Sequence, residues 1–158
     1  MTAKENRSVY IREATVRYRK RRVPKKTYHC IGQDASGPGK VASLFKNMQM
    51  ETVEKGYVLH LNTQRIIESF QLISIGTIRS GYLSPREVFH GALLANADRI
   101  ICVHNHPSGN AKPSEEDKVL TVALENAGEM IGIKLLDHII IGRNSCYSFT
   151  TGGYQEFS

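Results

Sequence analysis

The most constraining feature of this sequence is a short apolar run, RIICVH at residues 99–104, followed directly by a loop and a long amphipathic stretch. A short, strongly apolar run of this kind indicates a strand buried on both faces of a sheet. Pro107, Gly109 and Pro113 then break the chain, and Ser114 caps a helix with the sequence EEDKVLTVALENAGEMI. A buried strand, a return loop and a long helix together predict a sheet with helices packed on its faces.

The rest of the chain supplies further strands and helices for this sheet. Period-two patterns and β-branched residues predict strands over 8–18, 55–62, 65–76, 133–142 and 146–151. Gly and Pro predict a loop over 32–40. Helical spacing predicts a helix over 41–52, and a capping box predicts one over 84–96. The fold class expected is α/β, a mixed sheet flanked by helices. We expect one main domain over 51–158, with residues 1–50 as a basic portion of it or an extension.

Charge is distributed unevenly along the 158 residues, whose formal net charge is +6. Residues 1–50 hold 12 Lys and Arg against 3 acidic residues, a net of +9, and residues 51–158 hold 9 against 12, a net of −3. The basic run VRYRKRRVPKK at 16–26 is either a solvated arm or a contact for nucleic acid. The side chains that would make weak, non-specific DNA contacts are Arg17, Arg19, Lys20, Arg21, Arg22, Lys25 and Lys26.

Neither a membrane span nor a secretory leader is expected from this sequence. No stretch approaches the roughly 18 apolar residues of a membrane helix, and the first twenty residues lack an apolar core. Cys30, Cys102 and Cys146 form no CxxC pair and no even-numbered framework. A cytoplasmic location without disulfides is therefore expected. The oligomeric state stays open.

Two histidines, His104 and His106, lie two residues apart at the end of the predicted buried strand. Side chains at i and i+2 of an extended backbone project to the same side, so both imidazoles can converge on one point. The return loop can bring Asp117, in the first turn of the next helix, over this strand end. Two histidine nitrogens and one carboxylate are typical of a zinc site with an open fourth position. The spacing therefore predicts a metal site of the catalytic type.

A purely structural explanation stays open for part of this segment. Ser114 and Asp117 match an acidic capping box, and three acids in a first helical turn suit the helix dipole. Such a cap stabilises a helix by about 1 kcal/mol. It does not account for two histidines on the same strand face just before it.

The pattern HNHP at 104–107, followed by Ser114 and Asp117, resembles the JAMM signature of the MPN/JAB metalloprotease family. The flanking segments, SIGTIRSGYLSPREVFHGALLANADRI before it and LLDHIIIG and YSF after it, are similar to the RadC branch of that family. The resemblance covers roughly residues 52–151. It implies a curved mixed sheet flanked by helices, similar to the cytidine-deaminase-like architecture.

The resemblance also implies a role for each matching residue. His104, His106 and Asp117 would hold Zn²⁺, which lowers the pKa of a bound water from about 15.7 toward about 7. The Ser114 hydroxyl would help to stabilise the developing oxyanion. A family glutamate upstream would act as general acid and base, and aligning KGYVLHLNTQRII with the RadC pattern places it at Glu54.

Several nearby residues leave alternatives open. Glu51 and Glu87 compete with Glu54 for the role of general base, although Glu51 falls inside a predicted helix and Glu87 already serves as a cap. His138, within an apolar strand, is either a hydrogen-bonded core histidine or a partner of a metal ligand. Cys102 shares the strand face of His104 and could line the site, but a buried apolar role is favoured over that of an added zinc ligand.

These features predict a zinc-dependent hydrolase that cleaves a peptide or isopeptide bond in a peptide or protein substrate. The first alternative is a nucleic-acid-associated accessory factor, tied to DNA repair or mobile elements, that uses the basic segment. The second is a non-catalytic binding module that contains zinc. The longer RadC proteins begin with a helix-hairpin-helix module, a pattern that residues 1–50 do not show, so a DNA role depends on the basic run.

Overall fold

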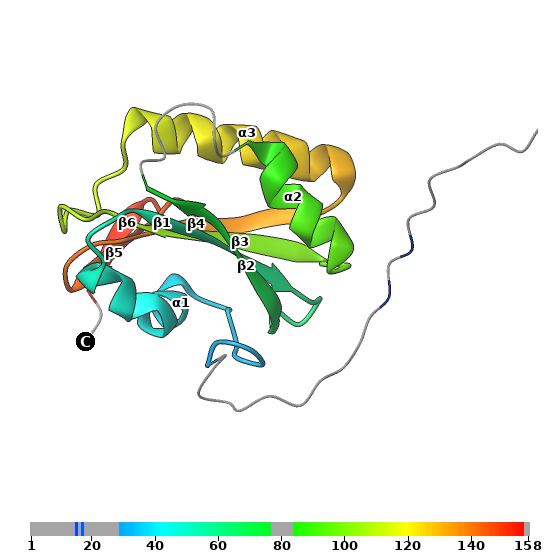
Figure 1. The fold of residues 1–158 in the computed structure, drawn as a ribbon, viewed down its shortest axis with the longest axis horizontal. Coiled ribbons are helices and arrows are strands. Elements are labelled where there is room, and N and C mark those ends of the chain that lie inside the picture. The colour runs from blue at the N-terminus through cyan, green and yellow to red at the C-terminus, as the bar shows by residue number, and fades with distance from the viewer. Residues whose placement is uncertain (1–14, 16, 18–28, 77–83, 157–158) are drawn as a thin grey trace, which may run out of the picture.

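The computed structural model describes residues 15, 17, 29–76 and 84–156 (Figure 1). Within these ranges one sheet contains six strands: β1 (Lys55–Leu61), β2 (Ile67–Ile75), β3 (Arg99–Asn105), β4 (Lys134–Ile141), β5 (Ser145–Ser148) and β6 (Gly153–Glu156). The helices are α1 (Pro38–Phe45), the 3-10 helix η1 (Lys46–Met50), α2 (Pro85–Leu94) and α3 (Glu115–Ile131). None of these described helices has the length and apolar content needed to cross a bilayer.

The sheet is mixed, with the strand order β2-β1-β3-β4-β5-β6. β3 and β4 are parallel, and every other neighbouring pair is antiparallel. Parallel strands need a crossover connection, which α3 supplies between β3 and β4. The expected α/β class with a mixed sheet and flanking helices is therefore confirmed, and the architecture is consistent with a JAB/MPN fold.

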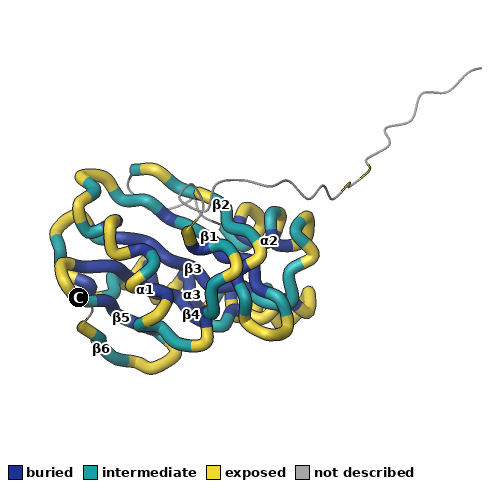
Figure 2. Tube along the Cα trace, turned by 90° about the horizontal axis from the view of Figure 1, so that it is seen from below, coloured by how far each residue is buried: buried dark blue, intermediate teal, exposed yellow. Residues whose placement is uncertain are grey.

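Helices cover both faces of the sheet. In Figure 1, α2 and α3 lie on one face and α1 lies on the other. Ile101 and Val103 of β3 belong to the core beneath α1, whereas Ile100 and Cys102 belong to the core beneath α2 and α3. Figure 2 shows β3 and β4 as buried strands in the middle of the sheet. This alternation directs His104, two residues after Cys102, toward the face that carries α3.

Two predicted elements differ from the observed ones, and a third lies outside the described residues. The first helix begins at Pro38, which sits favourably in a first helical turn, and it gives way to η1 after Phe45. The last predicted strand ends at Ser148, and the chain turns back into β6, a short polar strand without a clear sequence signal. The strand predicted over 8–18 and the basic run at 16–26 lie outside the described residues, apart from Thr15 and Arg17.

His60 on β1 should make the fold sensitive to acid. Its side chain is buried, and its Nε2 has no hydrogen-bond partner among the described residues. Burial lowers the pKa of His60 to about 4, whereas an unfolded chain keeps a value near 6.5. The unfolded chain therefore binds this proton more tightly. As the pH falls from about 6.5 to about 4, the free energy of unfolding should decrease by up to about 3 kcal/mol from this residue.

Urea unfolding of wild type and His60→Gln across this pH range measures that contribution. The variant should lose less stability on acidification, because glutamine does not titrate. Identical pH dependence in the two proteins would show that His60 is not the buried neutral group that we describe.

Candidate metal centre

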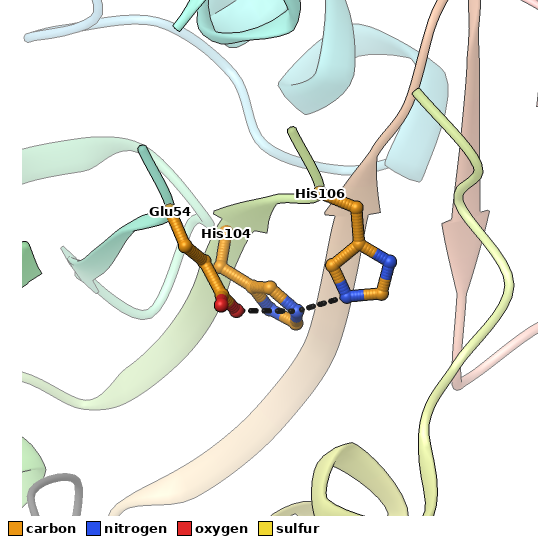
Figure 3. A group of neighbouring side chains, drawn as sticks. All are labelled: Glu54, His104 and His106. Carbon is orange, nitrogen blue, oxygen red and sulfur yellow. Dashed lines mark hydrogen bonds and ion pairs between the residues drawn. The ribbon is translucent and has the colours of Figure 1, made fainter. Parts of the chain in front are cut away.

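The two histidines of the HNHP segment converge at the carboxyl end of β3. His104 lies within the strand, and His106 follows it directly, with its backbone N–H donating to the Ile141 carbonyl at 3.0 Å. The Nε2 atoms of the two histidines are 3.1 Å apart, and Figure 3 shows the rings turned toward each other. The i, i+2 spacing on a strand therefore places both imidazoles on one side, facing a common point.

Asp117 approaches the same point from the first turn of α3. Its Oδ1 lies 3.1 Å from His104 Nε2, and its Oδ2 lies 3.4 Å from His106 Nε2. The Ser114 backbone N–H donates to Oδ2 at 2.8 Å and the Asp117 backbone N–H donates to the Ser114 hydroxyl oxygen at 3.1 Å, which forms the capping box. The Ser114 hydroxyl also donates to Oδ2, at 2.7 Å. The carboxylate that closes the capping box is thus also the candidate ligand, so its capping role does not exclude a ligand role.

Glu54 is the residue just before β1, and its side chain lies close to the histidines. The antiparallel register of β1 and β3 pairs Gly56 with His104, which brings the start of β1 beside the end of β3. Glu54 Oε1 lies 3.8 Å from His104 Nε2 (Figure 3). One candidate ligand atom from each of Glu54, His104 and His106 lies within 4.8 Å of the others, so this group could hold a metal ion.

The two competing glutamates make other contacts. The Glu51 carboxylate forms an ion pair with Lys55 at 2.7 Å. The Glu87 side chain accepts hydrogen bonds from the backbone N–H and hydroxyl of Ser84 and closes the capping box of α2. Both arrangements commit the carboxylate to a local structural role.

The return loop after His106 is held against the turn that follows β4. The Arg143 backbone N–H donates to the Gly109 carbonyl at 2.8 Å, and Gly109 has a φ of 80°. A Cβ atom at Gly142 would lie 2.7 Å from the Gly109 oxygen, so this approach requires glycine. Within the loop, the Asn110 carbonyl lies 2.8 Å from His106 Nδ1. Because a carbonyl only accepts, Nδ1 carries a proton, and in neutral His106 the Nε2 lone pair is free.

The donor set fits a divalent cation on chemical grounds. Carboxylate oxygens and imidazole Nε2 atoms, which are zinc ligands, converge here from three segments. Burial alone would lower the pKa of His106, but hydrogen bonds with Asp117 and Asn110 outweigh it and raise this pKa above its ordinary value. Burial alone would raise the pKa of Asp117, but hydrogen bonds with His104 and His106 hold it well below the usual range. The site therefore favours positive charge between these groups.

The site is closed on one side and open on the other. His104 and Asp117 are almost fully buried, whereas the side chains of His106 and Glu54 are 17% and 16% exposed. Two groups thus line an approach from solvent, which an exchangeable ligand or a substrate requires.

Asn105, the residue between the two histidines, was not singled out from the sequence. It is completely buried, and its side chain points away from the histidines by strand alternation. Its Oδ1 accepts from the Lys55 N–H at 2.8 Å, and its Nδ2 donates to the Val53 carbonyl at 3.1 Å. It thereby holds the backbone on both sides of Glu54. The contacts span about fifty residues of chain, so no local sequence pattern could have revealed them.

Asn105→Ala should destabilise the protein without removing its metal ligands. The substitution leaves the Lys55 N–H and the Val53 carbonyl, both in part-buried contacts, without this partner. An unsatisfied polar group costs about 1–3 kcal/mol where it is buried. Urea unfolding should show a loss of about 2 kcal/mol or more. Asn47→Ala, at an exposed asparagine of η1, is the control and should change stability by less than about 0.5 kcal/mol. Equal losses of stability in the two variants would show that the Asn105 side chain does not hold the backbone around Glu54.

The remaining predicted residues are not among the groups that converge on this point, although His138 contacts one of them. Cys102 is packed in the core beneath α2 and α3, and burial raises the pKa of its thiol to about 12. His138 is buried beside His104, with the two rings in hydrogen-bond contact. Arg17 is exposed, and the other basic residues considered for DNA contacts lie outside the described ranges.

The family model of the RadC-like JAB domain matches residues 35–154. The chain belongs to the RadC-like JAB domain family. The resemblance inferred from the HNHP segment and its flanks is thereby confirmed.

Two relatives within this RadC-like family show the extent of the similarity. The UPF0758 protein of Pelodictyon phaeoclathratiforme is 48% identical over 103 residues, which are 65% of this chain and 46% of that protein. The UPF0758 protein of Staphylococcus carnosus is 42% identical over 122 residues, 77% of this chain and 54% of that protein. The chain therefore spans about half the length of the curated relatives it matches.

Proposed function

We propose that this RadC-like chain is a zinc-dependent hydrolase of the JAMM type that cleaves a peptide or isopeptide bond. The observation that carries the proposal is the convergence of His104, His106, Asp117 and Glu54 on one partly exposed point. Three of these groups suffice to hold zinc with an open position, and the fourth can serve as a base.

Asp117 is the proposed third ligand, and Glu54 is the proposed base. Asp117 lies closer to the histidine nitrogens, at 3.1 and 3.4 Å, than the 3.8 Å that separates Glu54 from His104. Asp117 is also buried and held by Ser114, as a fixed ligand requires, whereas Glu54 faces the accessible side. These differences support the division of roles that the family resemblance implies.

The proposed reaction is the addition of water to the carbonyl carbon, followed by cleavage of the carbon–nitrogen bond. Bound zinc would supply Lewis acidity, which lowers the pKa of water from about 15.7 to about 7. Glu54 takes a proton from the attacking water and returns it to the leaving nitrogen. Ser114 is the proposed donor to the developing oxyanion, a role that requires its hydroxyl to turn from Asp117 Oδ2.

Elemental analysis combined with a cleavage assay tests this proposal. The purified protein should contain, or take up, about one zinc per chain. It should hydrolyse members of a library of peptides and isopeptide-linked peptides, lose this activity to a chelator and regain it with added zinc. Failure to take up any transition metal would overturn the proposal, and stoichiometric zinc without hydrolysis of any substrate would favour a binding module.

Weak DNA binding by the basic run is a second candidate function, favoured by the net charge of +9 over residues 1–50. Contacts between basic side chains and phosphates release counterions, so the affinity for duplex DNA should fall steeply as salt rises. Neutralising Arg19, Lys20, Arg21 and Arg22 should abolish the shift of a DNA fragment in gels, and His106→Ala should not. Sequence-specific binding that depends on His106 would contradict this separation.

A further inference from the structure

The second ring nitrogen of His104 contacts a histidine on the neighbouring strand. His104 Nδ1 lies 2.9 Å from Nε2 of His138, which β4 places beside β3 in parallel register. Both side chains are only 2% exposed. The His138 ring is stacked on Phe149, with centroids 5.0 Å apart and planes at 11°. His138 therefore has a fixed orientation, and its hydrogen bonds cannot be exchanged freely with water.

The hydroxyl of Thr121 determines which nitrogen of His138 carries the proton. Thr121, in α3, donates this hydroxyl proton to the Asp117 backbone carbonyl at 2.7 Å. Its Oγ1 also lies 2.7 Å from His138 Nδ1. A hydroxyl has one proton and a carbonyl can only accept, so Oγ1 must accept from His138 Nδ1–H.

The remaining proton positions follow from the same counting. In neutral His138, protonation of Nδ1 leaves Nε2 as an acceptor, and the contact with His104 then requires a proton on His104 Nδ1. Neutral His104 consequently presents an unprotonated Nε2 toward His106 and Asp117. The contacts form a closed ring through Asp117. Its backbone carbonyl accepts from Thr121, and its carboxylate faces His104.

We propose that Thr121 and His138 are positioning residues that fix the tautomer of His104 and so direct its Nε2 lone pair toward the metal. This inference deepens the proposed function and depends on it for the metal itself. The two histidine ligands are then oriented differently: His106 by the Asn110 carbonyl, and His104 by a relay of side chains. Histidine ligands commonly donate their second nitrogen to such a partner, and loss of the partner typically costs 10–100-fold in metal affinity.

Two substitutions at Thr121 separate this role from simple packing. Thr121→Val keeps the branched shape and removes the hydroxyl, whereas Thr121→Ser keeps the hydroxyl and removes a methyl group. Zinc affinity is measured by competition with a chromophoric chelator. We expect Thr121→Val to bind zinc about 10–100-fold more weakly than wild type and Thr121→Ser to bind close to wild type. A packing role predicts the reverse order, so valine binding as tightly as threonine would overturn the proposal.

The ring protons can be observed directly, without activity and without metal. Nitrogen-15 NMR of the histidine rings, recorded with and without zinc, distinguishes the two tautomers. We expect His138 to be protonated at Nδ1 in wild type and in Thr121→Ser, and to lose this preference in Thr121→Val. If wild type binds no zinc, the proposed function fails while this measurement still tests the relay. A proton on His138 Nε2 in wild type would overturn the inference, whether or not either variant folds.

Discussion

His106→Ala should yield a folded protein that no longer retains zinc. The substitution leaves two of the three proposed ligands, and the partly exposed side chain can be removed without opening the core. Zinc affinity should fall by more than the 10–100-fold that the loss of an outer hydrogen-bond partner costs. Metal content by elemental analysis should drop from about one zinc per chain to near zero, and any hydrolysis should disappear with it.

His90→Ala is the matched control for this prediction. His90 is exposed on α2, away from the end of β3, so its removal should change neither zinc content nor hydrolysis. Asp117→Ala should behave like His106→Ala toward the metal, although it also removes the carboxylate half of the capping box of α3 and up to about 1 kcal/mol of stability. Full zinc content in both His106→Ala and Asp117→Ala would place the ion elsewhere in the molecule.

Glu54→Gln should abolish hydrolysis while zinc stays bound. Glutamine preserves the shape of the side chain but does not take up a proton from water, so the general acid–base contribution is lost. Such a contribution is typically worth 10²–10⁴-fold in rate. The ligands His104, His106 and Asp117 are unchanged, and the zinc content of the variant should equal that of wild type.

Two other glutamates provide controls for this result. Glu51→Gln removes an ion pair with Lys55, and Glu87→Gln keeps a residue type that suits a capping box. Neither should reduce the rate appreciably. If Glu54→Gln loses its zinc, Glu54 is itself a ligand, and the base must be sought elsewhere. If Glu87→Gln alone is inactive, the alignment that selected Glu54 is wrong while membership of the RadC-like family stands.

The elements around the candidate site were predictable because their signals are local. The apolar run of β3 and the Ser114 cap of α3 lie at the expected positions, since both depend on residues within one or two turns of chain. The start of α1 and the existence of β6 were not predicted. Pro38 begins a helix inside a segment rich in loop residues. β6 is an edge strand with no fully buried residue, so its sequence carries no apolar alternation.

The sequence by itself determined the family, the α/β class and the spacing that places two imidazoles and one carboxylate around a strand end. These depend on strand periodicity and on a helix cap, both of which operate over a few residues. Only the tertiary structure decided what surrounds that set. The pairing of β1 with β3 brings Glu54 to the histidines and its two chain neighbours to the side chain of Asn105. The crossover through α3 places Thr121 against His138. These contacts join residues 17 to 52 positions apart, and such separations are bridged by sheet register and helix packing rather than by any local pattern.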